Sequence, residues 1–219
     1  MSITPTRLHV DLGYRPNPWQ RECHLALASE SRLAIVTHRQ AGKSTFAIMH
    51  VIDAALKDQT GVFALVVPEE RHRQFLWFGL KERIKPLVEH KAVEVHDARM
   101  AVKIGGAWIE VLAASDPDAL RGVSLAGLIA VEADMMKESV ADVLLPCLYG
   151  PAGAGWAALI GSLAPTPGLL SAALRSGVWP KKTFPVTATN VLPEDAVERA
   201  RQEMSEKAFA AEFLCERIV

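Results

Sequence analysis

The sequence predicts an α/β fold in which a mostly parallel central sheet is flanked by helices. Residues 61–67 (GVFALVV) and 125–131 (LAGLIAV) are apolar throughout, which indicates strands that are buried on both faces. Segments with helical spacing of apolar residues separate these runs. Buried strands that alternate with helices are typical of parallel sheets, which bind ligands at the carboxyl ends of their strands.

The first half of the chain shows this alternation clearly. A strand is predicted at residues 33–37, and Pro68 closes a second strand at residues 61–67. Helices are predicted at residues 43–56 and 69–89, because apolar side chains recur there at helical spacing. This order of elements is the one that a parallel sheet requires.

Three shorter strands are expected next, at residues 93–95, 100–104 and 107–112. Gly105 and Gly106 lie between the last two strands and predict a hairpin turn. The sheet is therefore expected to be mostly, but not entirely, parallel.

The second half of the chain continues the pattern less regularly. Its expected elements are a strand at 125–131, a helix at 139–149 bent at Pro146, a strand at 156–163, a short helix after the break at 165–168, a last strand at 182–188 and one or two amphipathic helices at 193–217.

Composition narrows the classes of protein that fit. The chain has 219 residues, of which 50% are hydrophobic, which suits a single domain spanning 1–219 with a helical or linker subregion from about residue 175. Its net charge is −1, so any basic surface must be local. The three cysteines show no C-x-x-C spacing, which argues against a zinc site. The sequence contains no stretch of about 18 uncharged apolar residues, so neither a membrane span nor a membrane partner is expected.

Residues 37–45 (THRQAGKST) follow a buried strand and open a helix, which is the setting of a phosphate-binding loop. Thr37 stands where the first glycine of G-x-x-x-x-G-K-[ST] is usual, whereas Gly42, Lys43 and Ser44 match. Lys43 is expected to reach the β and γ phosphates of a nucleotide, and the Ser44 hydroxyl to bind Mg²⁺. The predicted binding residues are Thr37, His38, Arg39, Gln40, Ala41, Gly42, Lys43, Ser44 and Thr45.

Arg39, inside this loop, makes the loop similar to that of one particular family of ATPases. R-Q-x-G-K-[ST] after a strand, here from Arg39 to Ser44, is similar to the large terminase subunits of tailed phages. The resemblance implies a P-loop NTPase fold of the ASCE or RecA-like type and an ATPase that drives double-stranded DNA into a capsid. It also implies that Arg39 contacts the phosphates of ATP.

Further segments resemble the same family in the same order, over roughly residues 14–217. The segment YRPNPWQ resembles its adenine-recognition segment, with Gln20 as the candidate, although Trp19 could instead pack in the core while Gln20 caps a helix. Arg121 resembles an arginine that acts on the ATP of a neighbouring subunit. Thr166, in the segment SLAPTPG, resembles a coupling residue that senses the hydrolysed phosphate.

The second phosphate motif departs from the family pattern of an apolar strand followed by Asp-Glu. Counting from Arg121 places Val131 at the metal-binding aspartate and Glu132 at the catalytic glutamate. A rival register gives Glu132 the metal role and leaves Ala133 in the catalytic position. We favour the first register, with Glu132 as the base and Ser44, phosphate oxygens and water around Mg²⁺. Asp134 lies just past the strand as a possible further ligand.

The resemblance also implies partners and limits. A packaging motor acts as a homo-oligomeric ring with a portal protein and a small terminase subunit, in the host cytoplasm on the procapsid. The family's nuclease domain would begin where this chain ends, so no nuclease activity is expected of it. The alternatives are a helicase-like DNA translocase and an assembly subunit that binds nucleotide but has lost hydrolysis through Val131. The lysine and arginine clusters do not single out residues that contact DNA.

Overall fold

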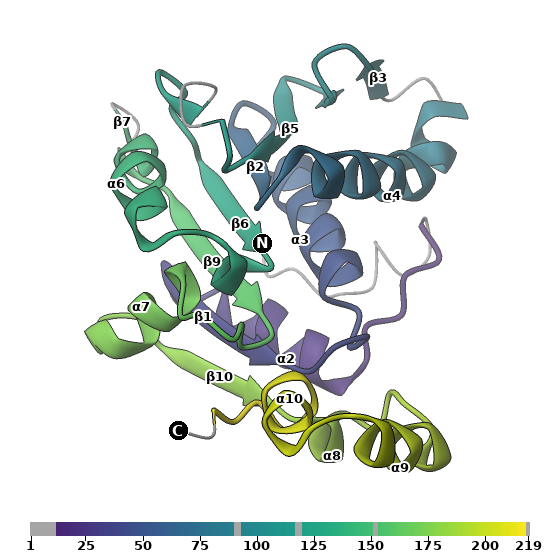
Figure 1. The fold of residues 1–219 in the computed structure, drawn as a ribbon. Helices are drawn as coiled ribbons and strands as arrows, with labels where there is room; N and C mark the ends of the chain where they lie inside the picture. Colours follow the sequence, from purple (N-terminus) through teal and green to yellow (C-terminus); the bar gives the residue numbers. More distant parts are fainter. Residues whose placement is uncertain (1–11, 90–92, 117–119, 151–152, 218–219) are drawn as a thin grey trace.

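An eight-stranded sheet forms the centre of the protein in a computed structural model that describes residues 12–89, 93–116, 120–150 and 153–217 (Figure 1). Its strands, in spatial order, are β10 (Lys181–Phe184), β1 (Arg32–Thr37), β9 (Trp156–Gly161), β6 (Gly127–Val131), β2 (Val62–Val67), β5 (Ala107–Ala113), β4 (Ala101–Ile104) and β3 (Val93–His96). The first six are parallel, while β4 and β3 run antiparallel at one edge. The predicted fold class is therefore confirmed.

Helices cover both faces of this sheet, as Figure 1 shows. Helices α3 (Lys43–Lys57) and α4 (Glu70–Glu89) pack against one face, and α2 (Pro18–Ala26) lies on the same side. Helices α6 (Ala141–Leu144) and α7 (Leu169–Ser176) lie on the other. Successive residues of one strand enter different cores: Leu65 belongs to the α3 side and Val66 to the α7 side. This alternation is why the central strands β2 and β6 are apolar at every position.

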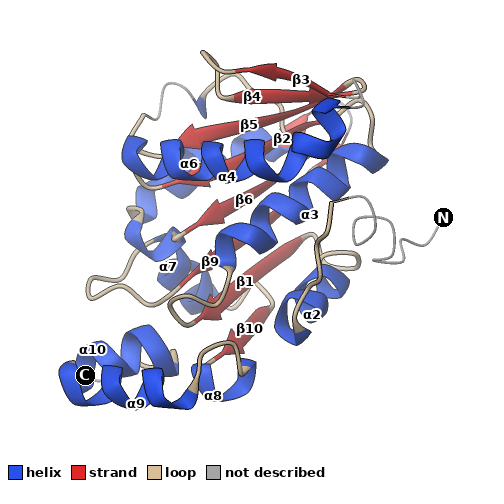
Figure 2. Cartoon of the chain, turned by 90° about the vertical axis from the view of Figure 1, so that its right-hand side faces the viewer, coloured by secondary structure: helices blue, strands red, loops and turns tan. Residues whose placement is uncertain are grey.

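The carboxyl ends of the parallel strands all lie at the same end of the sheet. The last helices of the chain pack near this end (Figure 2). Beyond β10 come α8 (Val186–Thr189), α9 (Glu194–Glu203), α10 (Glu206–Phe209) and a π-helical turn at Ala210–Leu214. The remaining short elements are η1 (Ala133–Met135), η2 (Glu138–Val140), η3 (Pro146–Leu148), β7 (Tyr149–Gly150) and β8 (Gly153–Ala154).

Two expected elements differ from the structure. The strand predicted at 182–188 ends at Phe184, and Pro185 is the N-cap of helix α8, because proline has no N–H to donate to the sheet. The helix predicted at 139–149 is broken into η2, α6 and η3, with Pro146 at the start of the last. The predicted hairpin between β4 and β5 is confirmed, and Gly105 has the positive φ (61°) that its turn needs. Within the described residues, no helix is long and apolar enough to cross a membrane.

A pair of histidines joins α2 to α3 on the inner side of these helices. The Nδ1 atoms of His24 and His50 are 2.8 Å apart and their rings stack. One of these two nitrogens must be unprotonated for the hydrogen bond to form. Burial, with the nearby His24 and Lys57, lowers the pKa of His50 well below its ordinary value of 6.5. The folded protein therefore holds His50 as a neutral side chain.

We expect this neutral histidine to make folding stability fall with pH below neutrality. The unfolded chain protonates His50 near pH 6.5 while the folded chain does not, so acid favours unfolding, by up to about 1.4 kcal/mol per pH unit below that value. Chemical denaturation at pH 7.5, 6.5 and 5.5 measures this slope. His50→Gln keeps a donor for His24 but does not titrate, so its slope should be shallower. Equal slopes in the two proteins would contradict the prediction.

Candidate nucleotide-binding site

The loop between β1 and α3 has the backbone of an anion-binding site. Gly42 occupies the N-cap of α3 with a φ of 92°, and Gln40 has a φ of 62°, so two residues of the loop are left-handed. Glycine adopts this conformation at little cost. The first N–H groups of a helix as long as α3 have no partner within the helix and face outward with the positive end of its dipole. The loop thus presents donors on its outer side, and phosphate binding by it stays a prediction.

Helix α2 fixes the carbonyl side of this loop. The Trp19 indole Nε1 donates to the Ala41 carbonyl at 3.1 Å, and the Gln20 Nε2 donates to the Gly42 carbonyl at 3.1 Å. Trp19 is buried between aromatic rings of α3 and β10, and Gln20 forms a reciprocal capping box with Asn17. The structure therefore shows both features of the alternative in which Trp19 packs in the core and Gln20 caps a helix.

The region after β10 fixes the start of the loop. The Thr37 hydroxyl donates to the Phe184 carbonyl at 3.2 Å. His38 is fully buried, with Nδ1 2.6 Å from the Arg39 carbonyl and Nε2 2.6 Å from the Thr189 hydroxyl. Burial lowers the pKa of His38, so its neutral ring donates through Nδ1 and accepts through Nε2. This histidine thus anchors the loop to α8, a role that the sequence did not reveal.

Arg39 lies at the outer side of the loop and meets the C-terminal turn. Its N–H donates to the Glu212 carbonyl at 2.8 Å, and its guanidinium lies 3.7 Å from the Glu212 carboxylate. The other carboxylate oxygen of Glu212 accepts a hydrogen bond from Ser162, just after β9. Because 66% of the Arg39 side chain is exposed, this ion pair is weak.

The side chains expected to do chemistry meet where β1 and β6 end. The Lys43 ammonium lies 3.3 Å from a Glu132 carboxylate oxygen and donates to the His38 carbonyl at 3.2 Å. Lys43 is buried, whereas 29% of the Glu132 side chain is exposed. Glu132 and Ser44 also line one cavity of about 570 Å³. The other residues around this cavity are Thr45, Ile48, Val67, Pro68, His72, Phe75, Leu76, Gly79, Glu82, Arg83 and Val131.

The carboxylate of Asp134 is bonded to backbone N–H groups and to an arginine of the protein, which is not the environment that a metal ligand needs. Its buried carboxylate accepts backbone N–H groups from Ala164 (2.8 Å), Gly168 (3.0 Å) and Ser171 (2.8 Å), and it pairs with Arg217 at 3.0 Å. Both oxygens are therefore committed to the protein. Among the described residues, no group of three or more His, Cys, Asp or Glu side chains could hold a metal ion.

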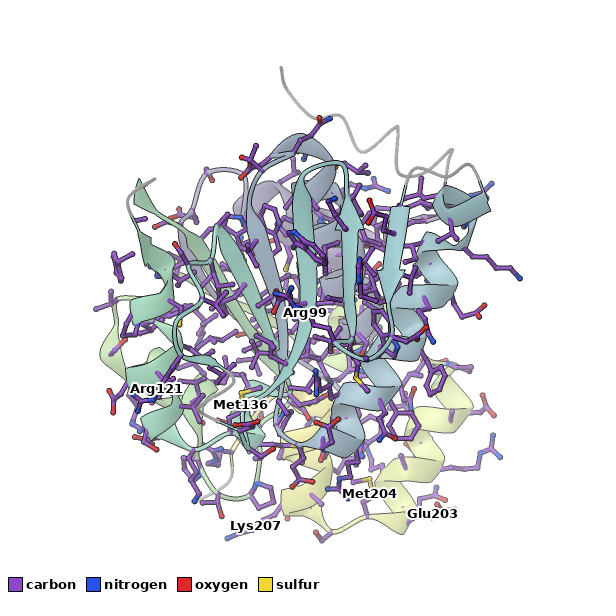
Figure 3. All side chains as sticks on the ribbon, turned by 90° about the horizontal axis from the view of Figure 1, so that it is seen from above. Arg99, Arg121, Met136, Glu203, Met204 and Lys207 are labelled. Atoms are coloured by element: carbon purple, nitrogen blue, oxygen red, sulfur yellow. The ribbon has the colours of Figure 1, made fainter. Side chains whose placement is uncertain are left out.

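Two further predicted residues lie at the surface. Thr166 is exposed in the loop between β9 and α7, the loop whose two ends Asp134 holds. Arg121 is exposed in the segment that leads into β6. Figure 3 shows Arg121 on the opposite side of the view from Glu203 of α9. The structure gives the positions of Thr166 and Arg121, whereas the coupling role of Thr166 and the trans-acting role of Arg121 stay predictions.

We expect Asp134 to be a major determinant of stability. Asp134→Asn replaces one acceptor oxygen with a donor that faces the Ala164 N–H and leaves Arg217 without its charge partner. The free energy of unfolding should fall by about 3 kcal/mol or more, measured by chemical denaturation. Glu138→Gln removes an exposed partner of Arg175 and serves as the control, with a change within about 1 kcal/mol. Equal effects of the two substitutions would contradict this assignment.

Comparison with solved structures places this architecture among known proteins. The ATPase domain of the Thermus phage P74-26 large terminase superposes with a TM-score of 0.84 at 18% identity, over 99% of this chain and 100% of that one. The HK97 bacteriophage large terminase gives a TM-score of 0.74 at 12% identity over 93% of this chain and 51% of its own. A third large terminase, from a thermophilic bacteriophage and in complex with ADP, gives 0.66 at 15% identity over 93% and 54%.

These structures are remote relatives in sequence. No family model matches the chain, and no curated protein matches it by sequence. The chain spans about half the length of the HK97 large terminase and of the ADP-bound one. The resemblance inferred from the loop arginine is nevertheless confirmed over the whole chain at the level of the fold. This protein has the fold of the ATPase domain of phage large terminase subunits.

Proposed function

We propose that this chain is an ATP-hydrolysing motor domain of the large terminase type, which drives double-stranded DNA into a capsid. The observation that carries the proposal is the ion pair between Lys43 and Glu132 beside a cavity that Glu132 and Ser44 line, at the carboxyl ends of two parallel strands. The third of the large terminases compared above has been solved with ADP and with ATP-γ-S, which supports nucleotide binding by this fold.

The residues of the cavity define how ATP would be held. Its phosphates would lie on the N-terminus of α3, with the Lys43 ammonium between the β and γ groups. The Ser44 hydroxyl would be the protein ligand of Mg²⁺, which neutralises phosphate charge when bound. Val131 is apolar at the place of the usual aspartate, so the remaining ligands would be phosphate oxygens and water, as Mg²⁺ commonly accepts.

Glu132 is suited to act as the general base. Its carboxylate pairs with Lys43 in the structure, and phosphates that draw Lys43 away would release it toward the attacking water. Arg39 would turn from Glu212 to the same phosphates. Both changes replace a protein ion pair by contacts to a more highly charged ligand.

The proposed motor extends beyond the single chain. Arg121, exposed before β6, would supply a fixed positive charge to the ATP of a neighbouring subunit in a ring. Thr166, in the loop held by Asp134, would relay the loss of the phosphate. Double-stranded DNA, a portal protein and a small terminase subunit are the proposed partners, in the host cytoplasm.

We expect ATP turnover to depend on both Lys43 and Glu132. Glu132→Gln should lower kcat about 100-fold or more while nucleotide binding persists, because only the proton acceptor is lost. Lys43→Ala should lower binding and turnover together, because it removes the charge that meets the phosphates. Phosphate release and equilibrium nucleotide binding, measured with and without DNA, separate the two effects. ATP turnover that neither substitution changes would sink the assignment.

Val131 provides a second test, because it stands where an aspartate usually helps to hold Mg²⁺. The wild-type protein should release phosphate, and Val131→Asp should change that rate less than about tenfold, since water can complete the metal shell. Circular dichroism must show that the variant folds, because Val131 is buried at the end of β6. A wild-type protein that binds ATP without releasing phosphate, and a variant that gains turnover, would instead favour an assembly subunit that has lost hydrolysis.

A further inference from the structure

We propose that Gln20 positions the phosphate-binding loop and does not read the base, so that its contribution to nucleotide binding is the same for adenine and guanine. This inference rests on the proposed function, because it concerns the same site. It departs from the adenine role that the sequence resemblance assigned to Gln20. Three observations carry it: the hydrogen-bond inventory of the Gln20 amide, the network behind it and the loop carbonyls in front of it.

The amide oxygen of Gln20 has no capacity left for a base. It accepts the Asn17 N–H at 3.0 Å and the Tyr14 hydroxyl at 3.3 Å, which uses both of its lone pairs. An amide that reads adenine must accept from the N6 amino group while it donates to N7. Gln20 is also almost completely buried, with 4% of its surface exposed. Its oxygen cannot serve a base without abandoning two partners in the interior.

A chain of hydrogen bonds fixes the orientation of this amide. The single proton of the Tyr14 hydroxyl goes to Gln20, so Tyr14 must accept from His24 Nε2, 3.0 Å away. In a neutral His24 the Nδ1 atom is then bare and accepts from His50 Nδ1 at 2.8 Å. The sense of donation therefore runs one way, from His50 of α3 through His24 and Tyr14 to Gln20. Rotation of the Gln20 amide would break this order along its whole length.

The other end of the amide meets the loop itself. Gln20 Nε2 donates to the Gly42 carbonyl, and a side chain at position 42 would place its Cβ 3.0 Å from that nitrogen. Trp19 holds the adjacent Ala41 carbonyl in the same way. Two consecutive carbonyls are thus turned toward α2, which leaves the N–H side of the loop for phosphate. The contribution of Gln20 to binding is consequently made through the phosphates and is the same for every base.

Equilibrium binding of ATP, GTP and inorganic tripolyphosphate to the full chain and its variants tests this inference. The ratio of the Kd values for ATP and GTP should be the same in the wild type and in Gln20→Ala, within about threefold. Gln20→Ala should weaken all three ligands by a common factor of about five to ten, the value of one lost hydrogen bond. Tyr14→Phe should also weaken the binding of all three ligands by a common factor, which should be smaller than that of Gln20→Ala. Asn17→Ala removes only the helix cap and should leave all three Kd values within about twofold.

Hydrogen exchange of the nucleotide-free protein gives an independent measure. Amides of residues 38–44 should exchange faster in Gln20→Ala than in the wild type and in Asn17→Ala. A wild type that prefers ATP over GTP more than tenfold, with Gln20→Ala weakening ATP alone, would overturn the inference. Failure of the proposed function looks different: triphosphates would not bind the wild type, or would bind Lys43→Ala equally well. In that event unchanged exchange in Gln20→Ala would still overturn the positioning role, and faster exchange would support it.

Discussion

A loop that offers its N–H groups to phosphate must turn carbonyl groups the other way, and those carbonyls need partners in the protein. In this chain the partners come from segments far apart in sequence. Helix α2 supplies the donors for Ala41 and Gly42. The ring of His38 accounts for the Arg39 carbonyl, and the Lys43 ammonium for that of His38. The loop is therefore an outcome of the whole fold, and a strand–loop–helix unit alone could not hold it.

The same constraint explains why the last quarter of the chain packs where it does. Phe184 and Thr189 anchor the beginning of the loop through Thr37 and His38, which requires β10 at the edge beside β1. Glu212 then reaches Arg39 by both backbone and side chain. A loop without its first glycine is held here by side chains: the Thr37 hydroxyl bonds to the neighbouring strand end, a contact that glycine could not make.

Periodicity and motif order were enough to predict the sheet and the hairpin, and to place the phosphate-binding loop and Glu132 each after a buried strand. Parallel strands end at a common edge, so residues that directly follow β1 and β6 are brought together by topology alone. The sequence could not show the surroundings of Asp134, because its partners Ala164, Ser171 and Arg217 follow at least 30 residues later. Nor could it distinguish a base-reading glutamine from a loop-holding one, since both need a buried amide and differ only in which atoms stand around it.

The ion pair between Lys43 and Glu132 joins the phosphate-binding loop to the end of β6. With Val131 in place of an aspartate, the strand end has one carboxylate, and in the structure that carboxylate neutralises the buried Lys43. A buried ammonium needs such a partner, because leaving it unpaired is costly. In the proposed mechanism, Glu132 therefore cannot act as a base until another anion has taken its place beside Lys43, and the phosphates of the nucleotide would be that anion. The Lys43 ammonium would thus have two successive anionic partners, and the proposal implies that the base becomes available only when a phosphate is present, so that nucleotide binding precedes proton transfer.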